Sequence, residues 1–380
     1  MPISRRNLLH GVGGAAVARL AIQSLGGFSL AGLSAPCHAS RPGGPILLNK
    51  NENAFGPSEK VMAAMREGLG LASRFPDSES DALIGKIANL HRVKPDQVIL
   101  GCGSTEILRM AAVALLGPGK KLVTTSPSFD AIVQYARATG AEVLARPLDK
   151  AFSHDLTAML ASADASTGLV YLCNPNNPTG TLTTRKDLEA FLRRLPATTH
   201  IVIDEAYHHY VGGSSAYASF IDRPLDDRRV IVTRTFSKIY GLAGIRIGYA
   251  IAASGTARRL SSYPLGDGLN VIAARAAATA LDDAEQVKAS ARRNADHRQE
   301  FFNQANARML RAIDSHTNFA MLNTGLPSGE VAEHFRKNNI LVAHGFASMD
   351  KYIRVSLGRP QEMLEFWRVW DLLPPHKMSM

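Results

Sequence analysis

The chain has 380 residues, a formal net charge of +10, and 46% hydrophobic and 20% charged residues. This length predicts about two domains with a sizeable core, and the composition excludes an intrinsically disordered protein. The excess of basic residues comes from scattered arginine pairs rather than from a basic tract with interleaved aromatic residues, so no nucleic-acid partner is expected.

Residues 1–39 predict a signal peptide, and its paired arginines resemble the twin-arginine export signal. The pair Arg5-Arg6 precedes a Gly-, Ala- and Leu-rich stretch that ends in small residues near Ala39, and no acidic residue occurs before Glu52. Arg19 interrupts the apolar stretch, so no stable membrane anchor is expected after cleavage. The expected location is the bacterial periplasm.

Strand-like and helix-like segments alternate after this signal. A short extended run at 46–49 and a turn-rich motif at 51–58 precede helices expected at 59–68, with Ser58 as the N-cap, and at 80–91. Strands are expected at 98–100, 122–125, 142–144, 169–172, 200–203 and 230–233, with helices from 104 to 116, up to 139, and from 185 to 195. Short apolar strands separated by helices predict an α/β fold with a mostly parallel sheet covered on both faces.

The chain becomes helical after Gly266 and then closes with a short α+β region. Helices are expected at 273–281 and 284–312, and strands at 319–322, 340–342 and 352–356. We therefore expect an N-terminal arm that joins the small domain (40–74), a large domain (75–265) and a smaller C-terminal α+β domain (266–380).

Polar clusters follow the carboxyl ends of the predicted strands, where open α/β sheets bind ligands. They are Gly101-Cys102-Gly103-Ser104-Thr105, Pro127-Ser128-Phe129, Asn174-Pro175-Asn176-Asn177-Pro178-Thr179-Gly180, Asp204-Glu205-Ala206-Tyr207 and the stretch from Thr235 to Arg246.

Together these clusters contain the groups that a pyridoxal phosphate site needs. Lys238 offers an amine for the aldehyde, and Asp204 offers a carboxylate for the pyridine nitrogen. Phe129 offers an aromatic ring for the cofactor face, while Asn177 and Tyr207 offer donors for the phenolic oxygen. The candidate phosphate ligands are a helix N-terminus and nearby hydroxyl and guanidinium groups, namely Ser104, Thr105, Thr235, Ser237 and Arg246.

The sequence gives little support for a dinucleotide, nucleoside triphosphate or metal site. Gly101-Cys102-Gly103 lacks the third glycine of a dinucleotide-binding fingerprint, and the chain contains no GxxxxGK[ST] motif. The adjacent His208 and His209 would point to opposite faces of a strand, so we expect exposed side chains there and no metal site.

Three motifs resemble the fold-type-I, class I/II aminotransferases, and in particular the histidinol-phosphate aminotransferase-like group. They are Asn174-Pro175-Asn176-Asn177-Pro178-Thr179-Gly180, Asp204-Glu205-Ala206-Tyr207 and the Lys238–Arg246 stretch. The opening motif at 51–58 and the closing run Tyr352-Ile353-Arg354-Val355-Ser356 are also similar to that group. The resemblance spans essentially all of the chain after the signal.

The resemblance implies a role for each site residue. Lys238, Asp204 and Tyr207 would be catalytic, with Lys238 bonded to the cofactor aldehyde and moving a proton during the reaction. Arg354 and Asn53 would bind the substrate, with Arg354 taking the α-carboxylate. Members of the family are homodimers with active sites at the subunit boundary, so a homodimer is expected here.

Two positions depart from the family pattern. Phe75 stands where the family usually has a tyrosine whose hydroxyl reaches the neighbouring subunit's cofactor phosphate. Ala343-His344 stands where histidinol-phosphate enzymes typically carry an arginine for the substrate's phosphate. With the predicted export, this second departure argues against histidinol phosphate as the substrate.

We therefore predict an exported pyridoxal 5′-phosphate-dependent aminotransferase. It would move an amino group from an amino acid, or an amino-bearing metabolite, to a 2-oxo acid. The sequence leaves two alternatives open: a decarboxylase or β-eliminating lyase on the same fold, and a non-catalytic envelope binding protein.

Overall fold

The computed structural model describes residues 44–222, 224, 227–265 and 268–373. The predicted signal peptide, residues 1–39, lies outside these residues. Among the helices formed by the described residues, none is both long and apolar enough to cross a bilayer.

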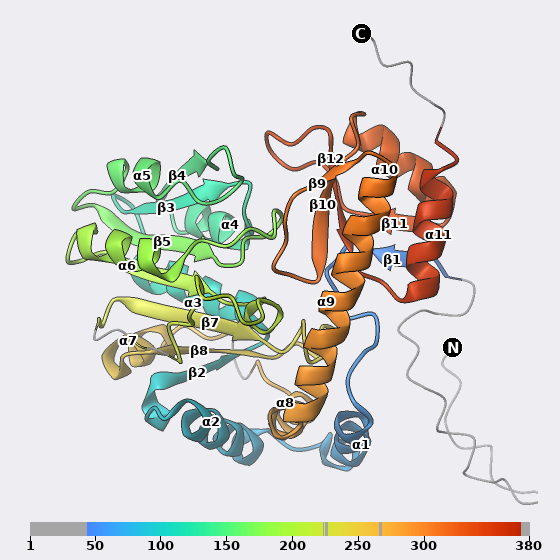
Figure 1. Ribbon diagram of the computed structural model, residues 1–380. Helices are drawn as coiled ribbons and strands as arrows, with labels where there is room; N and C mark the ends of the chain where they lie inside the picture. Colours follow the sequence, from blue (N-terminus) through green and yellow to red (C-terminus); the bar gives the residue numbers. More distant parts are fainter. Residues whose placement is uncertain (1–43, 223, 225–226, 266–267, 374–380) are drawn as a thin grey trace, which may run out of the picture. The chain divides into compact units, whose positions relative to one another are not determined.

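A seven-stranded sheet with helices on both faces forms the larger part of the fold (Figure 1). Its spatial order is β2-β8-β7-β6-β5-β3-β4, and only β8 runs antiparallel to its neighbours. The strands are β2 (Val98–Gly101), β3 (Lys121–Ser126), β4 (Glu142–Pro147), β5 (Thr167–Cys173), β6 (His200–Asp204), β7 (Val230–Thr235) and β8 (Gly248–Ala252). The predicted mostly parallel sheet is confirmed, although no strand was predicted at β8.

Alternating residues of the central strands face two different hydrophobic clusters. On β5, Val170 and Leu172 pack into one cluster, while Leu169 and Tyr171 pack into the other. The first cluster is covered by α1 (Glu59–Gly68), α2 (Asp77–His91), α5 (Leu156–Ala161), α6 (Arg185–Arg194) and α8 (Val271–Asp282). The second is covered by α3 (Ser104–Leu115), α4 (Ala131–Ala138) and α7 (Ser254–Leu260). Burial on both faces explains why these strands are continuously apolar in sequence.

A second, smaller region is built from two short sheets. β1 (Ile46–Leu48) pairs in parallel with β11 (Ile340–Val342), and β10 (Phe319–Asn323) lies between β12 (Tyr352–Ser356) and β9 (Arg311–Ala312) in antiparallel order. Helices α9 (Ala284–Ala307), α10 (Ser328–Lys337) and α11 (Pro360–Trp370) pack on these strands around Phe335 and Phe366. This region supplies Arg354 from β12.

Helix ends show where local signals suffice and where they do not. Ser58 caps α1 as predicted, because its hydroxyl accepts a hydrogen bond from the amide of Val61 at 3.4 Å. By contrast, α9 ends at Ala307 instead of the predicted residue 312. Met309 takes a left-handed conformation (φ 56°), and the next residues form β9. The pairing of β9 with β10 therefore overrides the continuing helical pattern.

The proposed boundaries at 39/40, 74/75 and 265/266 stay predictions. β1 of the N-terminal arm pairs with β11 of the smaller region. Helices α1 and α8, however, contribute Val61 and Ala273 to the cluster beneath the large sheet. Parts of the predicted N-terminal arm and of the predicted small domain therefore pack against the large sheet.

Candidate active site

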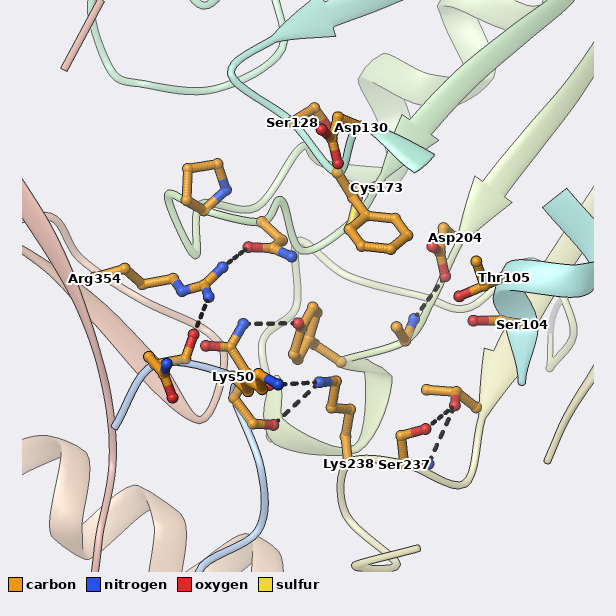
Figure 2. A pocket seen from close by; sticks show the side chains of 18 of the residues that line it. Lys50, Ser104, Thr105, Ser128, Asp130, Cys173, Asp204, Ser237, Lys238 and Arg354 are labelled. Atoms are coloured by element: carbon orange, nitrogen blue, oxygen red, sulfur yellow. Dashed lines mark hydrogen bonds between the residues drawn. The ribbon is translucent and has the colours of Figure 1, made fainter. Parts of the chain in front are cut away.

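One cavity of about 800 Å³ brings together eleven of the twelve predicted site residues (Figure 2). They are Ser104, Thr105, Phe129, Asn177, Asp204, Tyr207, Thr235, Ser237, Lys238, Arg246 and Arg354. The cavity lies at the carboxyl ends of the parallel strands, and residues 49–52 and 344–347 line its other side. This is the edge at which ligands bind open α/β sheets.

The turn between β2 and α3 allows close approach of a guanidinium. Gly103 has φ +76°, and a Cβ atom built there would collide with the guanidinium of Arg246. Glycine therefore lets Arg246 lie beside the first turn of α3, which begins at Ser104. The backbone N–H groups of Ser104 and Thr105 at the start of that helix and the neighbouring positive charge both favour an anion.

Two hydroxyl groups, one on the last residue of β7 and one just after it, complete this anion site. The Thr235 hydroxyl donates to the Ser237 hydroxyl at 2.9 Å, and the amide of Ser237 donates to Thr235 Oγ1 at 3.1 Å. Arg246 Nη1 donates to Ser237 Oγ at 3.3 Å. Hydroxyls, a guanidinium and a helix N-terminus in one place form a donor set suited to a phosphate.

Lys238 lies on the loop that follows β7. Its Nζ donates to the main-chain oxygens of Lys50 at 3.2 Å and Asn51 at 3.1 Å (Figure 2). Burial, followed by the positive charge of Arg354, lowers the pKa of Lys238 to about 8. A larger fraction of the amine is therefore neutral near neutral pH, which is the form that attacks an aldehyde.

Asp204 ends β6 and lies almost completely out of contact with solvent. Its Oδ1 accepts from the amide of Ala206 at 3.2 Å, and its Oδ2 accepts from the hydroxyl of Tyr171 at 3.0 Å. Burial raises the pKa of Asp204 to about 6. A buried carboxylate of this kind is stabilised strongly by a cationic partner such as a protonated pyridine nitrogen.

Glu205 follows Asp204 directly but lies on the opposite face of the sheet. Its Oε2 accepts from Nη2 of Arg234 at 3.0 Å and from the hydroxyl of Ser219 at 2.6 Å. Arg234 and Glu205 are both buried. The two neighbouring acids therefore have different tasks, because strand alternation gives only Asp204 to the cavity.

Residues 49–51 connect the N-terminal arm to the cavity. The side-chain amide of Asn51 donates to the Tyr207 hydroxyl at 3.0 Å, and the main-chain oxygen of Asn49 accepts from Arg354 Nη2 at 2.7 Å. Arg354 Nη1 donates to Oδ1 of Asn177 at 2.5 Å. Asn51 was missed as a site residue, although it opens the same turn-rich motif that contains Asn53.

Asn53 is the one predicted site residue outside the lining of this cavity. Its side-chain amide donates to the main-chain oxygen of Ile239 at 3.0 Å, and its Oδ1 accepts from the amide of Phe55 at 3.1 Å. These contacts hold the N-terminal loop against the loop that carries Lys238. In this structure the side chain supports the loop instead of facing the cavity.

The residues present fit pyridoxal phosphate. The anion site at Ser104 and Arg246 suits its phosphate, Asp204 suits its ring nitrogen and Lys238 suits its aldehyde. The guanidinium of Arg246 occupies the space that a Cβ at Gly103 would fill. The anion site therefore depends on glycine in this turn.

Known proteins of one family match nearly all of the described chain. The family described as "Aminotransferase class I and II" matches residues 44–367. The chain belongs to the class I and II aminotransferases. It is 38% identical over 324 residues to histidinol-phosphate aminotransferase 2 of Carboxydothermus hydrogenoformans, covering 84% of this chain and 88% of that protein.

Two further comparisons agree with this assignment. The histidinol-phosphate aminotransferase of Methylobacillus flagellatus is 35% identical over 87% of this chain and 89% of that protein. The crystal structure of histidinol-phosphate aminotransferase from Sinorhizobium meliloti in complex with pyridoxal-5′-phosphate has a TM-score of 0.80 and 28% identity, over 85% of this chain and 89% of that chain. This aminotransferase therefore has the predicted fold type I and uses pyridoxal phosphate.

The prediction for the histidine pair was wrong in conformation and in exposure, because both side chains are half-buried. His208 and His209 begin a 3₁₀ turn (His208–Tyr210) instead of extending a strand. The His208 ring is hydrogen-bonded to the Tyr217 hydroxyl at 2.9 Å, and the His209 ring to the Tyr240 hydroxyl at 3.3 Å. In the part of the chain that the structure describes, no group of three or more His, Cys, Asp or Glu residues is placed to hold a metal ion.

We expect this aminotransferase to lose stability in acid, because it contains buried histidines. His154 is hydrogen-bonded to Thr125 Oγ1 and to the Cys173 main-chain oxygen, both at 2.8 Å, and burial lowers its pKa to about 4. Between pH 6.5 and 4 the unfolded chain binds a proton at this residue that the folded chain does not. The contribution of His154 to stability is therefore lost as pH falls through this range.

His154→Gln tests this linkage by chemical denaturation at several pH values. The free energy of unfolding should fall less steeply with decreasing pH in the variant, by about 1.4 kcal/mol per pH unit at most. The exposed His344 provides the matched control as His344→Gln, which should leave the slope unchanged. Equal slopes for His154→Gln and the wild type would contradict the prediction.

Proposed function

We propose that this aminotransferase moves an amino group between an amino acid, or another amino-bearing metabolite with a carboxylate, and a 2-oxo acid. The observation that carries the proposal is the presence of Lys238, Asp204 and Arg354 in one cavity. Lys238 supplies an amine and Asp204 a buried negative charge. Arg354 supplies a fixed cation for the anionic end of a substrate.

Arg354 is held in place on several sides. Its guanidinium donates to Asn177 and Asn49 and lies 5.4 Å from the ring centroids of both Phe319 and Phe346. Its Nε has no hydrogen-bond partner among the described residues. An oriented guanidinium with unused donors supports paired binding of a carboxylate.

Ala343 supports a carboxylate rather than the phosphate of histidinol phosphate. Ala343 and Arg354 lie directly opposite each other, with Arg354 N donating to Ala343 O at 2.8 Å and Ala343 N donating to Arg354 O at 3.1 Å. An arginine at 343 would bring a second guanidinium beside the first, since opposite side chains are close neighbours. Here a methyl group stands in that position. We therefore propose a different substrate from the one in the names of the curated relatives.

Each residue has a defined task in this proposal. When bound, pyridoxal phosphate supplies an aldehyde that accepts the amino group and a cationic ring that draws electrons from the substrate's α-carbon. Lys238 Nζ would take the proton from that carbon and deliver it to the carbon of the cofactor's aldehyde. Asp204 keeps the proton on the ring nitrogen, and Arg354 holds the carboxylate so that the α-carbon stays beside Lys238.

A half-reaction screen tests the proposed function. Purified enzyme loaded with pyridoxal phosphate is mixed with single amino acids or with histidinol phosphate, without a 2-oxo acid, and conversion to pyridoxamine phosphate is followed by absorbance. We expect at least one amino acid to react faster than histidinol phosphate. Faster reaction of histidinol phosphate than of every amino acid would overturn the substrate assignment. Release of CO₂, or of an eliminated group without pyridoxamine phosphate, would favour the lyase alternatives.

Two variants assign the anion specificity to named positions. Arg354→Gln should lower kcat/KM for the best amino acid about 10- to 100-fold, because a charge-assisted hydrogen-bond pair is lost. Ala343→Arg should improve reaction with histidinol phosphate relative to the wild type. If Ala343→Arg leaves the ratio of the two substrates unchanged, position 343 does not select the anion.

We also propose export through the twin-arginine pathway to the periplasm. The support is the sequence of residues 1–39, with Arg5-Arg6 before a weakly apolar stretch. Arg5-Arg6→Lys-Lys should leave the full-length precursor in the cytoplasm, measured by cell fractionation and immunoblotting. Undiminished recovery of the variant from the periplasm would contradict this route.

A homodimer is proposed on the family pattern. Phe75 supports it, since this large apolar residue is 74% exposed. Burial of such a ring by a second subunit would remove apolar surface from water. Light scattering of the purified enzyme should give the mass of two chains, and a monomeric mass at micromolar concentration would reject the proposal.

A further inference from the structure

Tyr171 lies on the central strand β5 and contacts the carboxylate of Asp204 from the side away from the cavity. Its hydroxyl donates to Oδ2 of Asp204 at 3.0 Å, and its side chain is fully buried. No role was predicted for this tyrosine, which the sequence places inside an ordinary apolar strand. A buried hydroxyl needs a partner, and here the partner is a site residue.

The sheet register explains how Tyr171 reaches Asp204. β5 and β6 are parallel, with Tyr171 opposite Val202 and Cys173 opposite Asp204. Residues two apart on a strand share a face, so Tyr171, Cys173 and Asp204 all lie on the face covered by α3. The tyrosine ring therefore extends along this face toward the carboxyl end of β6, where its hydroxyl meets the carboxylate.

The surroundings make this hydrogen bond important for the charge of Asp204. The carboxylate adjoins the second hydrophobic cluster, which includes Tyr171 and Cys173, and burial favours its neutral form. Hydrogen bonds donated by the Tyr171 hydroxyl and the Ala206 amide favour the charged form. They also fix the plane of the carboxylate, because one bond ends on each oxygen.

We propose that Tyr171 is a positioning residue that keeps the Asp204 carboxylate ionised and oriented toward the ring nitrogen of pyridoxal phosphate. The inference rests on the proposed function through the pairing of Asp204 with that nitrogen. The inference goes further because Tyr171 does not line the cavity. It makes this residue contribute to the affinity for pyridoxal phosphate and to the protonation of the cofactor's ring nitrogen.

Tyr171→Phe removes only the hydroxyl and keeps the ring in the core. The dissociation constant of pyridoxal phosphate, measured on the apoenzyme by quenching of intrinsic fluorescence, should rise about tenfold. The acid limb of the pH profile of kcat should move to higher pH, because the ionised form of Asp204 loses a donor. Cofactor affinity is measured without substrate, so a failed substrate assignment leaves this readout intact.

Tyr210→Phe is the matched control. Tyr210 is also buried in the second hydrophobic cluster and has no hydrogen bond to Asp204. Its variant should keep the cofactor affinity and the pH profile of the wild type. In an Asp204→Asn background, Tyr171→Phe should add little to the loss of affinity, because the two groups act through one contact.

A second probe keeps the measurement decisive if Tyr171→Phe does not fold. Incorporation of 3-fluorotyrosine at position 171 makes the hydroxyl more acidic without changing the shape of the core. The stronger donor should tighten cofactor binding and move the acid limb to lower pH. Cofactor affinity and pH profile that follow the Tyr210→Phe control with both probes would overturn the proposal.

Discussion

Lys238→Ala should lower turnover at least about 10⁴-fold, since it removes both the proton carrier and the amine that bonds the aldehyde. Bound pyridoxal phosphate should also lose the absorbance that it has when it is bonded to a lysine. The anion site at Ser237 and Arg246 stays intact, so the variant should still bind the phosphate group. Absorbance spectra and single-turnover kinetics of the purified protein measure both effects.

The matched control for this prediction is Lys50→Ala. Lys50 also lines the cavity, but only its main-chain oxygen contacts Lys238. This variant should keep the bonded-cofactor spectrum. The wild-type apoenzyme should take up the aldehyde faster as pH rises through about 8, because the neutral amine of Lys238 then predominates. A lysine-bonded spectrum in Lys238→Ala would reject the assignment.

Asp204→Ala should lower kcat by about 10²- to 10³-fold, the usual cost of removing a preorganised electrostatic partner. The carboxylate is buried, so water cannot replace it well beside the ring nitrogen. Cofactor affinity should fall at the same time. Steady-state kinetics at saturating pyridoxal phosphate separate the loss of kcat from the loss of bound cofactor.

Glu205→Gln tests whether kcat depends on the carboxylate that faces the cavity or on either of the two adjacent carboxylates. Glu205 is the next residue, but its carboxylate pairs with Arg234 on the other face of the sheet. The variant should be less stable, by less than the roughly 3–5 kcal/mol that a fully unpaired buried charge costs, because Asp222 still lies 3.6 Å from Arg234. The folded enzyme should keep its kcat. A kcat loss in Glu205→Gln as large as that in Asp204→Ala would contradict the assignment of Asp204 to the ring nitrogen.

Eleven residues of the cavity lining could be predicted, mainly because parallel strands end at the same edge of a sheet. Lys238 and Asp204 follow β7 and β6 directly, and the β2–α3 turn leads to Ser104. Their polarity is conspicuous against the apolar strands that precede them. A short-range pattern therefore identified side chains that come together over more than a hundred residues of chain.

Contacts that depend on pairing across the fold were not predictable in the same way. Asn51 faces Tyr207 because β1 pairs with β11 and brings the N-terminal arm to the cavity. Asn53, two residues later in the same motif, is bonded to the loop at Ile239 instead. Nothing in the local sequence distinguishes the two asparagines, so only their tertiary positions separate their tasks.

The sequence by itself determined the alternation of strands and helices, the cap of α1 at Ser58 and eleven of the side chains that line the cavity. Hydrophobic period, capping and turn residues are local properties, so they can be derived from neighbouring positions. Only the tertiary structure decided that the Tyr171 hydroxyl donates to Asp204, that Glu205 pairs with Arg234 and that α9 ends at Ala307. These outcomes depend on strand register and on partners distant in the chain, which no local pattern encodes.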